Sequence, residues 1–106
     1  MTNFERLEQK PFFYKMGVCC GNNLYSTYKF DSFEKMMNEA ISIDNKYNDM
    51  KYCTFVFQAF KDTSYDFEKS CFWQEEVSVN NIVRKVESLA EDVWEAFEGE
   101  VQENDN

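Results

Sequence analysis

The chain has 106 residues, of which 20 are Asp or Glu, 11 are Lys or Arg and none is His. This length is typical of one domain, and a hydrophobic content of 43%, including 18% aromatic residues, argues against global disorder. The acidic excess argues against direct binding to nucleic acid, which depends on Lys and Arg. The absence of His removes the commonest general base and metal ligand.

The N-terminal segment is too polar for a secretory signal. Residues 1–15 contain Glu5, Arg6, Glu8 and Lys10, so they hold no apolar run of signal length. No other stretch reaches the roughly 18–20 apolar residues that cross a membrane. We therefore expect a cytoplasmic protein whose cysteines stay reduced. The cysteines are Cys19, Cys20, Cys53 and Cys71.

The first third of the chain predicts a β-hairpin. Apolar side chains recur at every second position over residues 12–20, which is the period of a strand. Gly21, Asn22 and Asn23 follow, and all three residue types tolerate a positive φ in a tight turn. Alternation resumes over residues 24–30, so these two runs are expected to pair.

An amphipathic helix is predicted to follow this hairpin. Asp31 lies three residues before Glu34, as in a capping box. The next apolar residues have the spacing of one helix face. They are Phe33, Met36, Met37, Ala40 and Ile41. From Ile43 onward the pattern gives way to a polar loop.

The second half repeats this order of elements. Residues 52–60 are nearly all apolar or β-branched, which indicates a central strand partly covered on both faces. A polar loop over 61–69 and an alternating strand over 71–79 come next. Asn80 or Asn81 is then expected to cap a second helix. The apolar face of that helix contains Ile82, Val83, Val86, Leu89, Ala90, Val93, Trp94 and Phe97.

This order predicts a two-layer α+β domain over residues 1–99. The expected architecture is a four-stranded, mainly antiparallel sheet with two helices on one face (ββαββα). The remaining residues, 100–106, are polar and acidic and are expected to form a disordered tail.

Sequence patterns for catalysis or metal binding are weak. Gly17-Val18-Cys19-Cys20-Gly21 matches a nucleophile-elbow spacing, but a turn and a strand follow instead of a helix. Adjacent cysteines on a strand point to opposite faces, so Cys19 and Cys20 do not suit a zinc site. Several carboxylates could pair for acid–base chemistry, but no pattern indicates a buried pair, so we expect them to be solvated on the surface. They are Glu75, Glu76, Asp62, Asp66 and Glu68. We expect no enzyme, cofactor or metal.

The aromatic residues exceed what one covered sheet face can bury. Most of the following set is expected in the core: Phe12, Phe13, Phe30, Phe33, Phe55, Phe57, Phe60, Trp94 and Phe97. A second set includes some side chains that must stay exposed, and exposed aromatic residues are favoured as interface anchors. This second set is Tyr25, Tyr28, Tyr65, Phe72 and Trp73.

Most of the net charge lies in the last fifth of the chain. Residues 1–86 hold 12 acidic and 11 basic side chains, whereas residues 87–106 hold eight acidic and no basic ones. On a helical wheel Glu87, Glu91, Glu95 and Glu98 form one stripe, with Asp92 beside it. Like charges at this spacing repel, and acids at a helix C-terminus oppose the macrodipole. One explanation is an acidic, solvent-facing surface that keeps the protein soluble. The alternative is that the stripe binds a basic surface on a partner macromolecule.

In size, charge and single-domain layout the chain is similar to small acidic inhibitors. These include phage-encoded anti-CRISPR and anti-restriction proteins, and immunity proteins that neutralise basic nuclease toxins. The resemblance implies an inhibitor of the basic nucleic-acid-binding surface of a protein partner. The stripe and Asp92 would supply charge, and Tyr65 and Trp73 would be the anchors. The alternatives are an immunity protein or a structural module whose sheet surface forms a homodimer.

Overall fold

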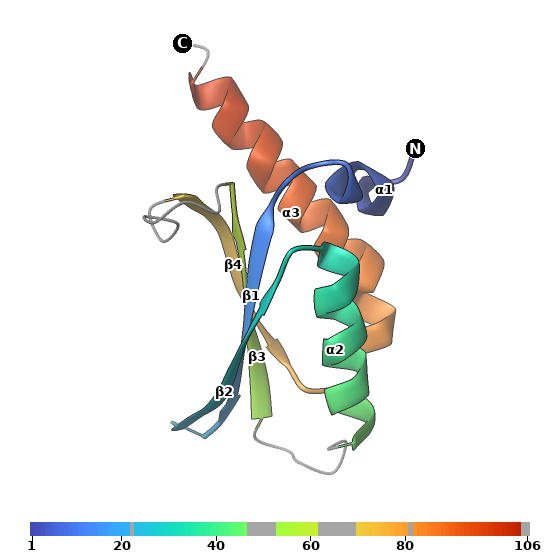
Figure 1. Cartoon of the computed structure of the whole chain (residues 1–106), viewed down its shortest axis with the longest axis vertical. Helices are drawn as coiled ribbons and strands as arrows, with labels where there is room; N and C mark the ends of the chain where they lie inside the picture. Colours follow the sequence, from blue (N-terminus) through green and yellow to red (C-terminus); the bar gives the residue numbers. More distant parts are fainter. Residues whose placement is uncertain (22, 47–52, 62–69, 81, 105–106) are drawn as a thin grey trace.

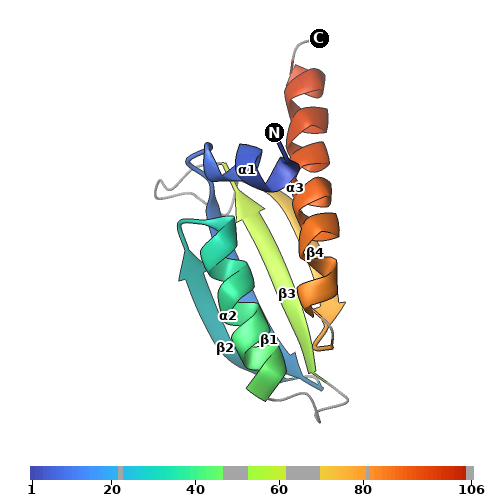
Figure 2. The ribbon, with the colours of Figure 1, turned by 90° about the vertical axis from the view of Figure 1, so that its right-hand side faces the viewer.

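The computed structural model describes residues 1–21, 23–46, 53–61, 70–80 and 82–104 (Figure 1). These residues form an antiparallel sheet with α2 and α3 on one face, and α1 lies across the N-terminal end of α2 and beside α3 (Figures 1 and 2). The elements are α1 (Asn3–Glu8), β1 (Phe13–Cys20), β2 (Asn23–Phe30), α2 (Phe33–Lys46), β3 (Cys53–Phe60), β4 (Cys71–Ser78) and α3 (Ile82–Asn104). The predicted α+β architecture is therefore confirmed.

The sheet consists of two hairpins joined through their first strands. Its order is β2-β1-β3-β4, and every neighbouring pair is antiparallel. β1 and β3 pair along their full lengths, from Phe13 opposite Phe60 to Cys20 opposite Cys53. The predicted central position of the apolar run 52–60 is thus confirmed for β3. Gly21 has φ +64°, as its place in the turn requires.

The core lies between the sheet and its two long helices. Met16, Phe55 and Phe57 point from the sheet toward Phe33 of α2 and Val93 of α3, and all five side chains are fully buried. Phe12 and Phe60 are buried as well, whereas the other predicted core aromatics are only half-buried. These are Phe13, Phe30, Trp94 and Phe97. The predicted apolar face of α3 was wrong at one position, because Val83 is 64% exposed.

The short helix α1 was not predicted. Thr2 begins it, because its side-chain oxygen accepts a hydrogen bond from the Glu5 backbone N–H at 3.1 Å. Leu7 is buried in the core, and the Phe4 ring lies 5.6 Å from the Phe33 ring, edge to face. Six residues are too few to show a helical period, so only tertiary packing reveals this helix.

The predicted capping box at the start of α2 is wrong in its members. Ser32 is the cap, and its hydroxyl oxygen accepts a hydrogen bond from the Lys35 N–H at 3.4 Å. Asp31 instead forms an exposed ion pair with Lys35 at 2.9 Å. The carboxylate that completes the cap is Glu8 of α1, which accepts from the Ser32 hydroxyl and from the Glu34 N–H, both at 2.9 Å.

The helix boundaries also differ from prediction. α2 continues to Lys46, so Asp44 lies within it and is buried, with 8% of its surface exposed. Its carboxylate accepts a hydrogen bond from the Ile82 N–H at 3.2 Å and so caps α3. Asn80 bonds through its backbone N–H to Ser78, and Asn81 lies outside the described residues. α3 continues to Asn104, five residues past the expected end of the domain at Gly99.

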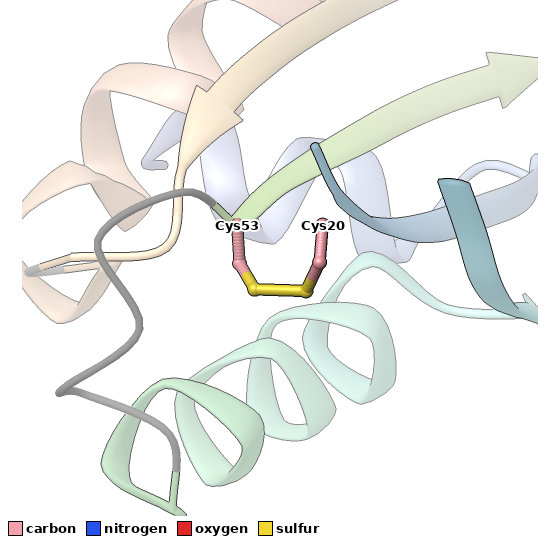
Figure 3. The surroundings of a disulfide bond; sticks show 2 residues. All are labelled: Cys20 and Cys53. Carbon is pink, nitrogen blue, oxygen red and sulfur yellow. A yellow bond between two sulfur atoms is a disulfide. The ribbon is translucent and has the colours of Figure 1, made fainter. Parts of the chain in front are cut away.

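A disulfide joins Cys20 to Cys53, on the sheet face that α2 covers (Figure 3). The two residues are directly opposite in the β1–β3 register, with Cα atoms 4.2 Å apart. The expectation of four reduced cysteines is therefore wrong for this pair. The sequence could not reveal the bridge, because the pairing of β1 with β3 was unknown. Cys19 and Cys71 are free thiols.

Within the described ranges, no helix has both the length and the apolar character needed to cross a membrane.

Candidate binding surface on helix α3

The acidic stripe, defined as Glu87, Glu91, Glu95 and Glu98, lies on the solvent-facing side of α3. All four residues are exposed, as the wheel predicted. On the opposite side of the helix, Leu89, Ala90 and Val93 are buried against the sheet. Burial of this apolar face fixes the helix rotation, and the rotation in turn presents the carboxylates to solvent.

Asp92 does not belong to this stripe. It is half-buried on the flank of α3 that faces β4, where it interacts with the carboxyl group of Glu75. Burial raises the pKa of Glu75, and the negative charge of Asp92 raises it further, while Lys85 acts in the opposite direction. The predicted acidic set therefore divides into an exposed stripe and an inward-facing carboxyl pair, Glu75 and Asp92.

Of the other carboxylates considered for acid–base chemistry, the structure describes only Glu76. Glu75 lies on the helix-covered face of β4, whereas Glu76 is exposed on the opposite face. Asp62, Asp66 and Glu68 lie outside the described residues. Among the residues that the structure does describe, no group of three or more Cys, Asp or Glu side chains is placed to hold a metal ion.

The stripe is arranged unfavourably for the isolated helix. No acidic residue lies in the first turn of α3 and no basic residue in its last turn, although the macrodipole prefers both. Arg84 and Lys85 are exposed near the N-terminal end instead. In the described part of the chain, no Lys or Arg forms an ion pair with a carboxylate of the stripe. The four charges therefore face solvent without local neutralisation.

Arg6 of helix α1 and Lys10, just after this helix, lie against the aromatic flank of α3. The Arg6 guanidinium lies 5.8 Å from the centre of the Trp94 ring, and the Lys10 ammonium lies 5.2 Å from the Phe97 ring. Contacts of this kind contribute about 0.5–1 kcal/mol each at exposed sites. The sequence carried no signal for them, because α1 itself was not predicted.

Of the two predicted aromatic anchors, the structure describes only Trp73. Trp73 was predicted to be an exposed anchor, and this is wrong, because it is buried with 9% of its surface exposed. The register places Trp73 opposite Ala59 on the helix-covered face, so it packs in the core. Tyr65 lies outside the described residues. Tyr28 and Phe72 are half-buried.

Phe72 instead belongs to a small aromatic cluster with Phe12 and with Phe97 of α3. The ring of Phe12 lies 4.9 Å from the ring of Phe72 and 4.9 Å from the ring of Phe97. These contacts hold α3 against β4 and the segment before β1, so the cluster supports the helix that carries the stripe.

Comparison with known proteins gave no relative. No family model, no curated protein and no solved structure matches this chain.

Proposed function

We propose that this protein is a small, non-enzymatic inhibitor that binds the basic, nucleic-acid-binding surface of a protein partner through helix α3. The acidic stripe supplies the contact, and the partner is a nuclease or other nucleic-acid-binding effector. The proposed biological setting is a phage-encoded antagonist of a host defence system such as CRISPR-Cas or restriction. No direct contact with nucleic acid or membrane is part of this proposal.

The observation that carries the proposal is the exposure of all four carboxylates on one side of α3. Three successive like-charge pairs, from Glu87 through Glu91 and Glu95 to Glu98, each cost a few tenths of a kcal/mol in the free helix. Solubility requires only charge, and mixed signs would provide it without this repulsion. A basic surface on a partner attracts all four carboxylates, which offsets their mutual repulsion and steers the partner toward the helix.

The dimensions of α3 suit a groove or channel that holds a phosphate backbone. The helix has 23 residues and is about 34 Å long at 1.5 Å per residue. Its C-terminal part projects beyond the sheet, so a partner can approach it there from several sides (Figure 1). Consecutive stripe carboxylates lie about 4.5–6 Å apart along the axis, against about 3.4 Å for phosphates of one strand. The match is therefore one of charge and length, not of spacing.

The disulfide sets a condition on the proposed cytoplasmic location. Thiols are kept reduced in that compartment, where stable disulfides are rare. The stripe lies on α3, whereas the bridge joins β1 and β3. An inhibitor that works in the cytoplasm must therefore bind its partner with the bridge reduced, and binding should survive reduction.

The test compares three immobilised forms of the chain as baits for basic nucleic-acid-binding proteins. These forms are the wild type, the double variant Glu91→Lys with Glu95→Lys, and a control, Glu5→Lys with Glu34→Lys. The control makes the same charge change at two exposed residues of α1 and α2. We expect the wild type and the control to retain a partner that elutes with salt and competes with duplex DNA. The α3 variant should retain none.

Circular dichroism must show that the α3 variant is folded. Equal retention of the same partner by the wild type and the folded α3 variant would overturn the proposal. Capture of a partner that does not release nucleic acid when the chain is added would overturn it too.

A further inference from the structure

The Cys20–Cys53 bridge lies at the end of the sheet from which α3 starts (Figure 3). Cys20 is the last residue of β1, and Cys53 is the first residue of β3. β4 ends beside Cys53, and Val79, the residue after β4, donates its N–H to the Cys53 carbonyl oxygen at 2.9 Å. α3 begins soon afterwards, at Ile82. The bridge is therefore connected to the start of α3 through Cys53 and Val79.

The bridge joins β1 to β3 at a position where the backbone does not. In an antiparallel sheet, both backbone groups of a residue point toward the same neighbouring strand, and successive residues alternate between the two neighbours. The Cys53 carbonyl points toward β4, because it accepts from Val79. Cys20 and Cys53 are thus a non-hydrogen-bonded pair of the β1–β3 ladder, and they are also its last pair. At this end of the sheet the disulfide takes the place of a ladder hydrogen bond.

Reduction of the bridge should loosen this end of the sheet more than the rest. Two separate thiols need more room than two bonded sulfur atoms, so reduction moves Cys53 away from Cys20. The hydrogen bond from Val79 then depends on a residue that β1 no longer holds. Val79 and Ile82 are both buried, and the Ile82 N–H is bound by Asp44 of α2. Movement of Cys53 therefore disturbs the contacts that hold the start of α3.

We propose that the Cys20–Cys53 bridge is a reversible redox switch for the start of α3. With the bridge closed, the first turn of α3 is held against the end of the sheet. With the bridge reduced, this turn and the adjoining strand ends open locally, while the rest of the domain stays folded. The reductant is a dithiol.

The exchange runs through the more accessible sulfur. Cys20 is half-buried, whereas Cys53 is buried. A thiolate of the reductant attacks Cys20 Sγ, the S–S bond breaks, and the Cys53 thiolate leaves and takes up a proton. The second thiolate of the reductant then attacks its own sulfur in the mixed disulfide and releases the Cys20 thiolate, which is protonated in turn. The reductant becomes a disulfide, and its two electrons reside on the two protein thiols.

The switch acts on a different part of α3 from the proposed contact. The acidic stripe begins at Glu87, beyond the first turn of the helix. Leu89 and Val93 are buried farther along α3, so the stripe stays on a docked helix in both redox states. The switch therefore does not depend on the proposed function, and the failure of one leaves the other unaffected.

The test is hydrogen exchange of the full chain, followed by NMR with the bridge closed and after reduction with dithiothreitol, at a series of low urea concentrations. In the reduced chain, the amides of Val79 and Ile82 should exchange about tenfold or more faster than that of Phe57, in the middle of β3. Their rates should not rise with urea, because local opening exposes little surface. Oxidised glutathione should restore the original pattern.

Two variants complete the test. Cys20→Ser with Cys53→Ser should reproduce the reduced pattern without any reductant. Cys19→Ser is the matched control, because Cys19 is a free thiol next to the bridge, and this variant should behave like the wild type in both states. The proposal is wrong if dithiothreitol opens the bridge only at urea concentrations that unfold the chain. Equal acceleration of all three amides, or a pattern that oxidised glutathione does not restore, would equally exclude a local, reversible switch.

Discussion

The Glu8 carboxylate at the end of α1 accepts a hydrogen bond from the backbone N–H of Glu34, the second residue of α2, at 2.9 Å. Its other oxygen accepts a hydrogen bond from the Ser32 hydroxyl, also at 2.9 Å. The N-terminus of α2 is therefore capped by a side chain from 26 residues earlier in the chain. This contact joins a six-residue helix, too short to be stable alone, to the rest of the domain.

Replacing Glu8 with Ala should lower the free energy of unfolding by about 1 kcal/mol, the usual effect of losing a cap. Glu8→Gln keeps one acceptor oxygen and should lose less. Urea unfolding followed by circular dichroism measures both. Glu39→Ala is the control, because it removes a carboxylate from the middle of α2, away from either helix end. A loss for Glu39→Ala as large as that for Glu8→Ala would contradict the capping role.

A second cap, at the start of α3, is buried. Asp44 accepts a hydrogen bond from the Ile82 N–H at 3.2 Å, and its other oxygen has no hydrogen-bond partner among the described residues. Asp44→Ala should lower the free energy of unfolding by about 1–3 kcal/mol, because it leaves a buried N–H unsatisfied. Asp44→Asn retains an acceptor and should cost less. The same urea experiment tests this prediction, and equal losses in the two variants would argue against the hydrogen bond.

These two caps show where sequence reasoning reached its limit. Hydrophobic periods correctly predicted all four strands and both long helices, because burial on one face leaves a local pattern. Asp31 matched the capping pattern locally, but Glu8 holds the cap. Similarly, the Ile82 N–H at the start of α3 is bound by Asp44, which lies 38 residues away in the sequence. Contacts between residues far apart in sequence leave no local pattern, so α1 and both caps depend on tertiary structure.

For the candidate binding surface on α3, too, the features with a local sequence pattern could be predicted and those set by tertiary contacts could not. The exposed acidic stripe could be predicted, because the apolar face of α3 fixes which side points outward. The position of Asp92 depends on where β4 runs beneath the helix, and the sequence does not contain that information in local form. Trp73 was misplaced for the same reason. Alternation assigned it to one face of β4, but could not tell which face the helices cover.

The disulfide predicts a measurable loss of stability on reduction. Cys20 and Cys53 are 33 residues apart, and closing a loop of this size stabilises a protein by about 3–4 kcal/mol in the chain-entropy model. Cys20→Ala with Cys53→Ala should therefore lower the free energy of unfolding by about this amount in urea. The single variant Cys19→Ala should change it far less. Thiol titration of the unfolded, unreduced wild type should count two free thiols, Cys19 and Cys71, and titration of all the cysteines would refute the bridge.

The carboxyl pair of Glu75 and Asp92 predicts a pH dependence with a definite sign. The pKa of Glu75 is raised above its ordinary 4.5 in the folded protein, by burial and then by the charge of Asp92. The folded state therefore binds a proton more tightly than the unfolded chain does. The contribution of Glu75 to stability is fully present below pH 4.5 and is lost as the pH rises through the raised value. At neutral pH the ionised side chain is destabilising.

Glu75→Gln removes this charge while keeping the shape of the side chain. The variant should be more stable than the wild type at pH 7, and its advantage should shrink steadily as the pH falls toward 4.5, where the wild-type carboxyl is protonated. Thermal unfolding at a series of pH values measures the difference. Glu76→Gln is the matched control, because Glu76 is exposed on the opposite face of the same strand. If the advantage of the Glu75→Gln variant stays constant with pH, the pKa of Glu75 is not raised in the folded protein.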